Sequence, residues 1–253
     1  MSIRRTSATL TAIVALSTIS IQTSSAQEPA AKEAEPTVHP SVAHLNEDKR
    51  DELRDLLQEA SKLAQSQRSQ EMLLKLDEAA VLAPDYFGIH NLRGVAYSHL
   101  RKFELAKAEF QKAQKLEPKA LDVQFNIAEM DFVSHKFDLA LAQFEKLIKD
   151  NPKLPTGTYQ LLQYKVVISK LKLGQEAEAK KIMDTLTPYE DTPIFHMTKA
   201  AYEFSKDNED EAQSWIRSAR GIYTAQQVAN FLDALIEVDW VESLAKPTPP
   251  KNG

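Results

Sequence analysis

The sequence predicts an all-α protein, built as a solenoid of about five helix-turn-helix units that ends in a capping helix. A spacing of 34 residues recurs through the middle of the chain, and an amphipathic segment follows the last repeat. Composition agrees, because Ala, Leu, Lys, Glu and Gln dominate while the 253 residues include only 6 Gly and no Cys. So few glycines argue against a turn-rich all-β fold, and the missing Cys excludes disulfides, thiolate zinc sites and a cysteine nucleophile.

The chain is acidic, with a formal charge of −5 from 31 basic and 36 acidic residues. The first 26 residues carry Arg4 and Arg5 and no acid, so their removal leaves 29 − 36 = −7. An acidic protein is a poor partner for nucleic acid or for anionic lipid. We therefore expect no nucleic-acid partner. The charge does not predict the oligomeric state.

Residues 1–26 have the three parts of a secretory signal peptide. Two arginines precede an apolar stretch from Leu10 to Ile21, and Ser24-Ser25-Ala26 forms a small-residue cleavage site. The stretch is shorter than the roughly 20 apolar residues that span a bilayer. We predict cleavage after Ala26, export to the periplasm or the medium, and no membrane insertion afterwards. An uncleaved membrane anchor and a mitochondrial transit peptide are the alternatives.

Residues 27–45 are predicted to be a flexible tether and residues 245–253 a disordered tail. Both segments contain several prolines and no apolar period. Such segments bury too little apolar surface to offset the entropy that ordering costs. The repeats are then expected over 46–224 and the capping helix over 225–244.

Five columns of residues keep the period of 34, which is the mark of a repeat protein. They are Pro84/Pro118/Pro152, Ala60/Gly94/Ala128, Met72/Ala106/Ala140, Leu76/Phe110/Phe144 and Ala79/Ala113/Leu147. Small residues are expected where two helices approach closely, and each Pro is expected to end a second helix. The period then slips, because Ala140, Phe144 and Leu147 recur 39 residues later as Ala179, Met183 and Leu186, and 33 after that as Ala212, Ile216 and Ala219.

The units are expected at about 47–84, 85–118, 119–152, 155–190 and 192–224. Asn46, Ser69 and Asp85 are predicted helix N-caps. The extra residues of the fourth unit are placed near 151–159, where two prolines and a glycine indicate a longer connection, with a longer following helix as a further option. The last helix has an apolar face that fits a cap over the final repeat, made of Val228, Phe231, Leu232, Leu235, Val238 and Val241.

This pattern resembles the tetratricopeptide repeat (TPR) family. The second unit carries the family's signature at Gly94, Tyr97, Ala106, Phe110, Ala113 and Pro118, with His90 in place of the leading Trp. The resemblance covers roughly 53–223, and the fourth unit departs from it with Val167 where a small residue is expected. It implies a right-handed superhelix in which the first helix of each unit lines a concave groove.

The resemblance also implies that the groove binds a protein or peptide. In the repeat register its predicted contacts are Asn91, Val95, Phe125, Glu129, Tyr164, Ile168 and Met197, flanked by Leu57, Ser61 and Ala201. Such a set suits an extended peptide or an amphipathic helix, with Phe125 and Tyr164 as aromatic anchors. The alternative for each is packing against the neighbouring helix. A carboxylate clamp is not expected, because Leu57, Ser61, Asp122 and Asn126 stand where it would need Lys, Asn, Lys and Arg.

No nucleophile, metal or phosphate-binding motif is found, so we predict no enzyme activity, no cofactor and no metal site. The acidic run 207–211 lacks the glycine and the final glutamate of a calcium loop, and is expected to cap a helix. The prediction is a non-catalytic, exported scaffold. The alternatives are a membrane-anchored, periplasmic chaperone-like factor that binds unfolded clients, and an enzyme that uses carboxylates gathered by the solenoid.

Overall fold

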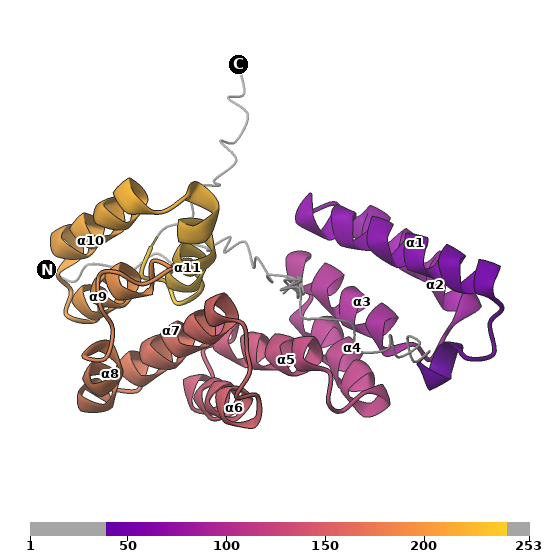
Figure 1. Ribbon diagram of the computed structural model, residues 1–253, viewed down its shortest axis with the longest axis horizontal. Helices are drawn as coiled ribbons and strands as arrows, with labels where there is room; N and C mark the ends of the chain where they lie inside the picture. The colour runs from indigo at the N-terminus through magenta and orange to yellow at the C-terminus, as the bar shows by residue number, and fades with distance from the viewer. Residues whose placement is uncertain (1–38, 242–253) are drawn as a thin grey trace, which may run out of the picture. The chain divides into compact units, whose positions relative to one another are not determined.

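The computed structural model describes residues 39–241, and within that range the chain contains eleven α-helices, one short 3-10 helix and no strand (Figure 1). This confirms the predicted all-α class. The described residues divide into two compact units, 39–130 and 131–241, and the division falls inside α5. The predicted signal peptide, the tether up to residue 38 and the tail lie outside the described residues.

Ten of the helices form five consecutive hairpins, at the positions that the repeat predicts. They are α1 (Glu47–Gln65) with α2 (Ser69–Leu82), α3 (Phe87–His99) with α4 (Phe103–Leu116), α5 (Leu121–Val133) with α6 (Phe137–Asp150), α7 (Thr156–Lys172) with α8 (Glu176–Met183), and α9 (Ile194–Ser205) with α10 (Glu209–Ile222). A last helix, α11, covers Ala225–Glu237. None of the described helices is both long and apolar enough to cross a membrane.

Every hairpin turns through one residue in the left-handed backbone region. These residues are Gln67, Arg101, His135, Gly174 and Asp207, with φ between 55° and 73°. The surrounding hydrogen bonds repeat as well: in the second hairpin the N–H of Arg101 donates to Ser98 O and that of Lys102 to Tyr97 O, at 2.9 and 2.8 Å. Successive turns are 34, 34, 39 and 33 residues apart, so the backbone carries the same slip as the sequence.

The five extra residues of the fourth hairpin lie mostly in its first helix. That helix, α7, has 17 residues where α3 and α5 have 13, and the connection before it is one residue longer than the one before α5. The lengthened helix thus accounts for four of the five residues. The slip is therefore chiefly one added helical turn, and the longer connection is the smaller part.

The small-residue columns lie at close helix contacts, as predicted. Gly94 of α3 faces the ring of Phe110 of α4, and a Cβ added to Gly94 would be only 2.4 Å from Phe110 Cε1. Ala60, Ala106 and Phe110 are fully buried in residues 39–130, as are Ala140, Phe144 and Ala212 in residues 131–241. The repeat thus describes the core of each unit correctly.

The end of the predicted tether is ordered, which corrects that part of the prediction. Pro40–Val42 forms a 3-10 helix, and Val42 is 8% exposed. The ring of His39 lies 5.7 Å from the ring of Tyr86 and 5.5 Å from that of Phe87, and its Nε2 is 3.3 Å from Glu117 Oε2. These aromatic contacts hold the segment against the second hairpin.

Helix α11 packs on α7, α9 and α10 (Figure 1). It begins with a capping box, in which Thr224 and Gln227 bond each other's backbone N–H groups. It ends at Glu237, earlier than the predicted residue 244, and Asp239 then takes a positive φ of 61°. Val228, Phe231, Leu235 and Val238 of its predicted apolar face are buried, whereas Leu232 and Val241 are half-buried. The helix covers α7 of the fourth hairpin as well as the last repeat.

Candidate partner-binding faces

In residues 39–130, the first helices α3 and α5 are joined by a row of polar side chains. Asn91 Nδ2 donates to Asp122 Oδ2 at 2.8 Å, and Asn126 Nδ2 donates to Asn91 Oδ1 at 2.9 Å. We call Asn91, Asp122 and Asn126 the amide row. Asn91 is therefore engaged inside the protein, where sequence reasoning expected its polar end to need water or a partner.

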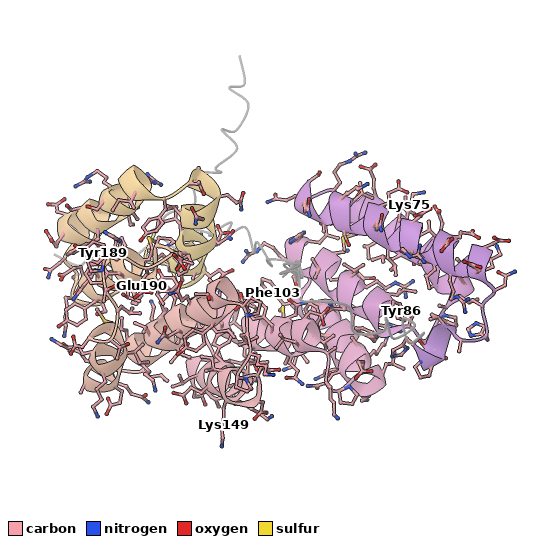
Figure 2. The ribbon with its side chains drawn as sticks, viewed as in Figure 1. Lys75, Tyr86, Phe103, Lys149, Tyr189 and Glu190 are labelled. Atoms are coloured by element: carbon pink, nitrogen blue, oxygen red, sulfur yellow. The ribbon has the colours of Figure 1, made fainter. Side chains whose placement is uncertain are left out.

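One end of the amide row is open to solvent. Asp122 and Tyr86 are both partly exposed, and Tyr86 lies just before α3 (Figure 2). Burial raises the pKa of the Asp122 carboxyl, although hydrogen bonds from backbone N–H groups oppose this. Burial, and then the charge of Asp122, raise the pKa of Tyr86. A hydrogen-bond donor from a partner could reach the carboxylate here, beside an aromatic ring.

The other predicted contacts of this unit are buried side chains. Val95, Phe125 and Glu129 are each 2% exposed. They do not form a solvent-facing row in the described protein, which agrees with the alternative that such residues pack against neighbouring helices. Their assignment to a partner stays a prediction.

In residues 131–241, the predicted contacts Tyr164, Ile168 and Met197 are fully buried. Tyr164 and Ile168 belong to α7 and Met197 to α9, the two first helices on which α11 packs. The ring of Phe231 of α11 lies 5.1 Å from that of Tyr164. At Tyr164, the face predicted to receive a partner is thus covered by the protein's own last helix.

An ion pair lies inside this contact. Lys165 Nζ of α7 is 3.0 Å from Glu237 Oε2 of α11, and the two side chains are 4% and 0% exposed. The same ammonium group lies 4.5 Å from the centre of the Phe132 ring. Two backbone carbonyl groups at the end of α11 also accept hydrogen bonds from side chains. Lys172 Nζ donates to Val238 O at 2.7 Å, and His135 Nε2 donates to Glu237 O at 3.1 Å.

Burial perturbs the titration of the acids on α11. It raises the pKa of Glu237, while Lys165 acts in the opposite direction. Burial, and then the charge of Glu237, raise the pKa of Asp233 to about 7. Tyr164 has a pKa well above its usual range because it is buried, and because Glu237 is near. Tyr164 Oη and Glu237 Oε1 are buried without a hydrogen-bond partner.

Sequence reasoning missed Lys165, Asp233 and Glu237. One signal was present: Lys165 is the only charged residue between Leu161 and Ser169, a segment otherwise apolar or neutral. A lone charge in such a helix needs a partner inside the fold. The partner could not be found from the repeat, because Glu237 lies in α11, which follows the last repeat.

The described residues offer little for catalysis or metal binding. No group of three or more His, Asp and Glu side chains between 39 and 241 is arranged to hold a metal ion. A shallow pocket of about 260 Å³ lies at the connection between α6 and α7, lined by Ile148, Asn151, Pro152, Leu154, Thr156 and Tyr159. These side chains present neither a nucleophile with an adjacent base nor a pair of carboxylates.

No family model matches the sequence, and no curated protein matches it. Solved structures of TPR proteins do share its fold. A TPR protein from Parabacteroides merdae has a TM-score of 0.54 at 16% identity, over 72% of this chain and 70% of that one. The pilF protein of Pseudomonas aeruginosa has a TM-score of 0.57 at 13% identity, over 77% and 90%. MamA of Desulfovibrio magneticus RS-1, from its residue 41 onward, has a TM-score of 0.51 at 17% identity, over 68% and 95%.

At 13–17% identity these likenesses concern the fold alone. They agree with the five hairpins and with the repeated turn geometry. The chain therefore has a TPR-like helical solenoid fold, and the handedness of its superhelix stays a prediction.

Proposed function

We propose that the protein is a non-catalytic, exported scaffold that binds a protein or peptide through the first helices of its hairpins. The observation that supports this best is the packing of α11, an amphipathic helix, against the first helices α7 and α9. A surface that recognises one such helix has the shape and the apolar character to recognise another. The TPR-like fold of the neighbours supports the same class of function.

The physical mechanism is recognition by a preformed surface. The first helices are fixed by their packing within each hairpin, so binding orders few additional side chains and loses little entropy. In residues 39–130, Asp122 and Tyr86 supply a partly exposed carboxylate and an aromatic ring, which suit a partner that brings an N–H donor.

Site-specific photo-crosslinking in cells that produce the full chain tests this proposal. A crosslinking amino acid replaces Tyr86 or Asp122 on the first-helix side. Leu105 and Ala108, which are exposed on the second helix α4, serve as matched control positions. We expect one discrete protein adduct from the first-helix positions and none from the controls. Adducts from the α4 positions alone would contradict the proposed face, and a ladder of many clients would favour the chaperone alternative.

Export is tested by mass spectrometry of the purified protein. A mature chain that starts at Gln27, recovered from the periplasm or the medium, is the expected result. A chain that starts at Met1 or Ser2 and sediments with membranes would contradict release and favour the anchored alternative.

A further inference from the structure

Helix α11 presents one apolar stripe to the rest of the C-terminal unit. Val228, Phe231, Leu235 and Val238, the residue just after the helix, follow one another at intervals of three, four and three residues, and each is at most 4% exposed. Residues at this spacing lie on one side of a helix. Helix α11 packs on the first helices α7 and α9 as well as on α10, so its contact with the two first helices resembles a helix laid into a groove.

A charge fixes the position of α11 along this groove. Because Lys165 and Glu237 are both buried, moving the helix by one turn would leave each charge without the other in an apolar setting. An uncompensated buried charge is strongly unfavourable, so the pair selects one register. The groove thus recognises a defined pattern: an apolar stripe, and a carboxylate six residues after its central aromatic residue.

The docking of α11 also carries a cost that an all-apolar helix would not have. It places the half-buried Asp233 beside the buried Glu237, so that two acids lie close together in partly desolvated surroundings. It leaves Tyr164 Oη and Glu237 Oε1 without hydrogen bonds. Unsatisfied buried polar atoms and desolvated acids reduce the net free energy of a contact. The occupant is therefore held less tightly than its apolar area suggests.

The attachment of α11 would allow it to leave while the hairpins stay in place. Tyr223 and Thr224 link it to α10, and Tyr223 Oη donates to Glu190 O at 2.9 Å, which fixes the base of this link (Figure 2 labels Glu190). Beyond the helix, Lys172 Nζ lies 4.4 Å from the centre of the Trp240 ring. The same ring is stacked on that of Phe204, with 6.4 Å between the ring centres. A change of backbone angles near Thr224 would release the helix as one rigid piece.

We infer that the α7/α9 face is a docking site for an amphipathic helix that carries a carboxylate, and that α11 is its resident occupant, which a partner helix displaces. This inference rests on the proposed function and names the chemistry of the partner. A competing helix needs an aromatic residue over Tyr164 and a carboxylate that reaches Lys165. Binding is then regulated from within, because the partner gains access only when α11 opens.

A fluorescent peptide with the sequence of residues 224–241 tests the inference without any knowledge of the partner. It is titrated into the full chain and followed by anisotropy. In the Phe231→Ala chain the resident helix is weakened while the receiving face is intact, so we expect at least tenfold tighter binding of the peptide than to the wild-type chain. Ile222→Ala is the matched control, because Ile222 is 63% exposed on α10 and its loss should leave binding unchanged.

The charge is tested in the same assay. A peptide in which Glu237→Gln removes the carboxylate should bind the Phe231→Ala chain at least tenfold more weakly. When Lys165→Met is added to that chain, the two peptides should bind alike. Equal binding of the peptide to wild-type and Phe231→Ala chains, or no effect of the carboxylate while Lys165 is present, would overturn the inference.

Hydrogen exchange of the wild-type chain covers the case in which Phe231→Ala unfolds. We expect the amides of α11 to exchange at least tenfold faster than those of α7, because α11 opens by itself. Exchange of α11 only together with α7, in global unfolding, would overturn the inference. Neither experiment uses the partner or the Tyr86 and Asp122 positions, so either can fail while the crosslinking test of the proposed function succeeds.

Discussion

Substituting Gly94 by Ala adds one methyl group at the tightest helix contact in the second hairpin. The added Cβ would lie 2.4, 2.5 and 2.8 Å from three carbon atoms of the Phe110 ring. Carbon atoms in a protein core normally stay about 3.5–4.0 Å apart, so the overlap exceeds 1 Å. The ring of Phe110 is fully buried and cannot turn outward to relieve it. The helices α3 and α4 must therefore separate.

Two opposing contributions set the size of the effect. Overpacking of a core costs about 1–3 kcal/mol, and the severe overlap places this site near the upper end. Replacing Gly by Ala inside a helix contributes roughly 1 kcal/mol of stability. We therefore expect Gly94→Ala to lower the free energy of unfolding by about 2 kcal/mol.

A matched control comes from Gly221 in α10, where an added Cβ would have no neighbour within 4 Å. Gly221→Ala should stabilise the protein by up to about 1 kcal/mol, so the same chemical change should have opposite signs at the two sites. Urea unfolding followed by far-UV circular dichroism measures both. Adding Phe110→Leu to Gly94→Ala should restore part of the loss. If the two alanine variants are stabilised equally, the assignment of Gly94 to a close helix contact is wrong.

Three further predictions follow from burial and backbone geometry. Phe125→Ala and Tyr164→Ala, chosen from sequence as partner contacts, should each cost about 3–5 kcal/mol in a thermal melt, because both side chains are buried; melts like the wild type's would contradict that burial. Gly174→Ala should lower the free energy of unfolding by about 1–2 kcal/mol, because Gly174 has a φ of 73°. Gln67→Gly should raise it in the same urea assay, because Gln67 has a φ of 55°. A neutral Gly174→Ala would argue against the left-handed turn. Burial raises the pKa of Asp233 in the folded protein from its ordinary 3.8 to about 7. Its contribution to the free energy of unfolding is therefore greatest below pH 4 and is lost as pH rises through 7. The loss amounts to roughly 4 kcal/mol when the group is fully ionised. Asp233→Asn should flatten the dependence of stability on pH between 5 and 8, and an unchanged profile would refute the assignment.

Most of the fold could be predicted because the same buried contacts recur in each repeat unit. The columns that contain Gly94, Phe110 and Ala140 identified buried contacts, and the slip of five residues identified the hairpin that is lengthened. Helix starts were predicted less well. Asn46 caps α1 by accepting from Lys49 N–H, as expected, but Ser69 lies inside α2. The left-handed turn sets the start of each second helix, so no capping side chain is needed there.

The candidate site was harder to predict, for a physical reason. A repeat register determines which side of a helix a residue occupies, but it does not determine what covers that side. Tyr164 lies on a first helix, as expected, and the ring packed against it is that of Phe231 in α11, a segment outside the period. The pair of Lys165 with Glu237 is 72 residues apart in sequence and belongs to no column. Only the three-dimensional arrangement joins them.

The added turn of α7 also explains how one repeat could grow without disturbing its neighbours. Four residues lengthen a helix by about 6 Å and rotate it by roughly 400°, which is one full revolution plus about 40°. Residues before and after the insertion therefore keep nearly the same rotational phase, and Leu162 and Val167 stay fully buried on a helix four residues longer than its counterparts. An insertion of two residues at the same point would rotate everything before it by about 200° and turn those side chains toward the solvent. The length change that this solenoid accommodates is thus the one that matches the helical pitch.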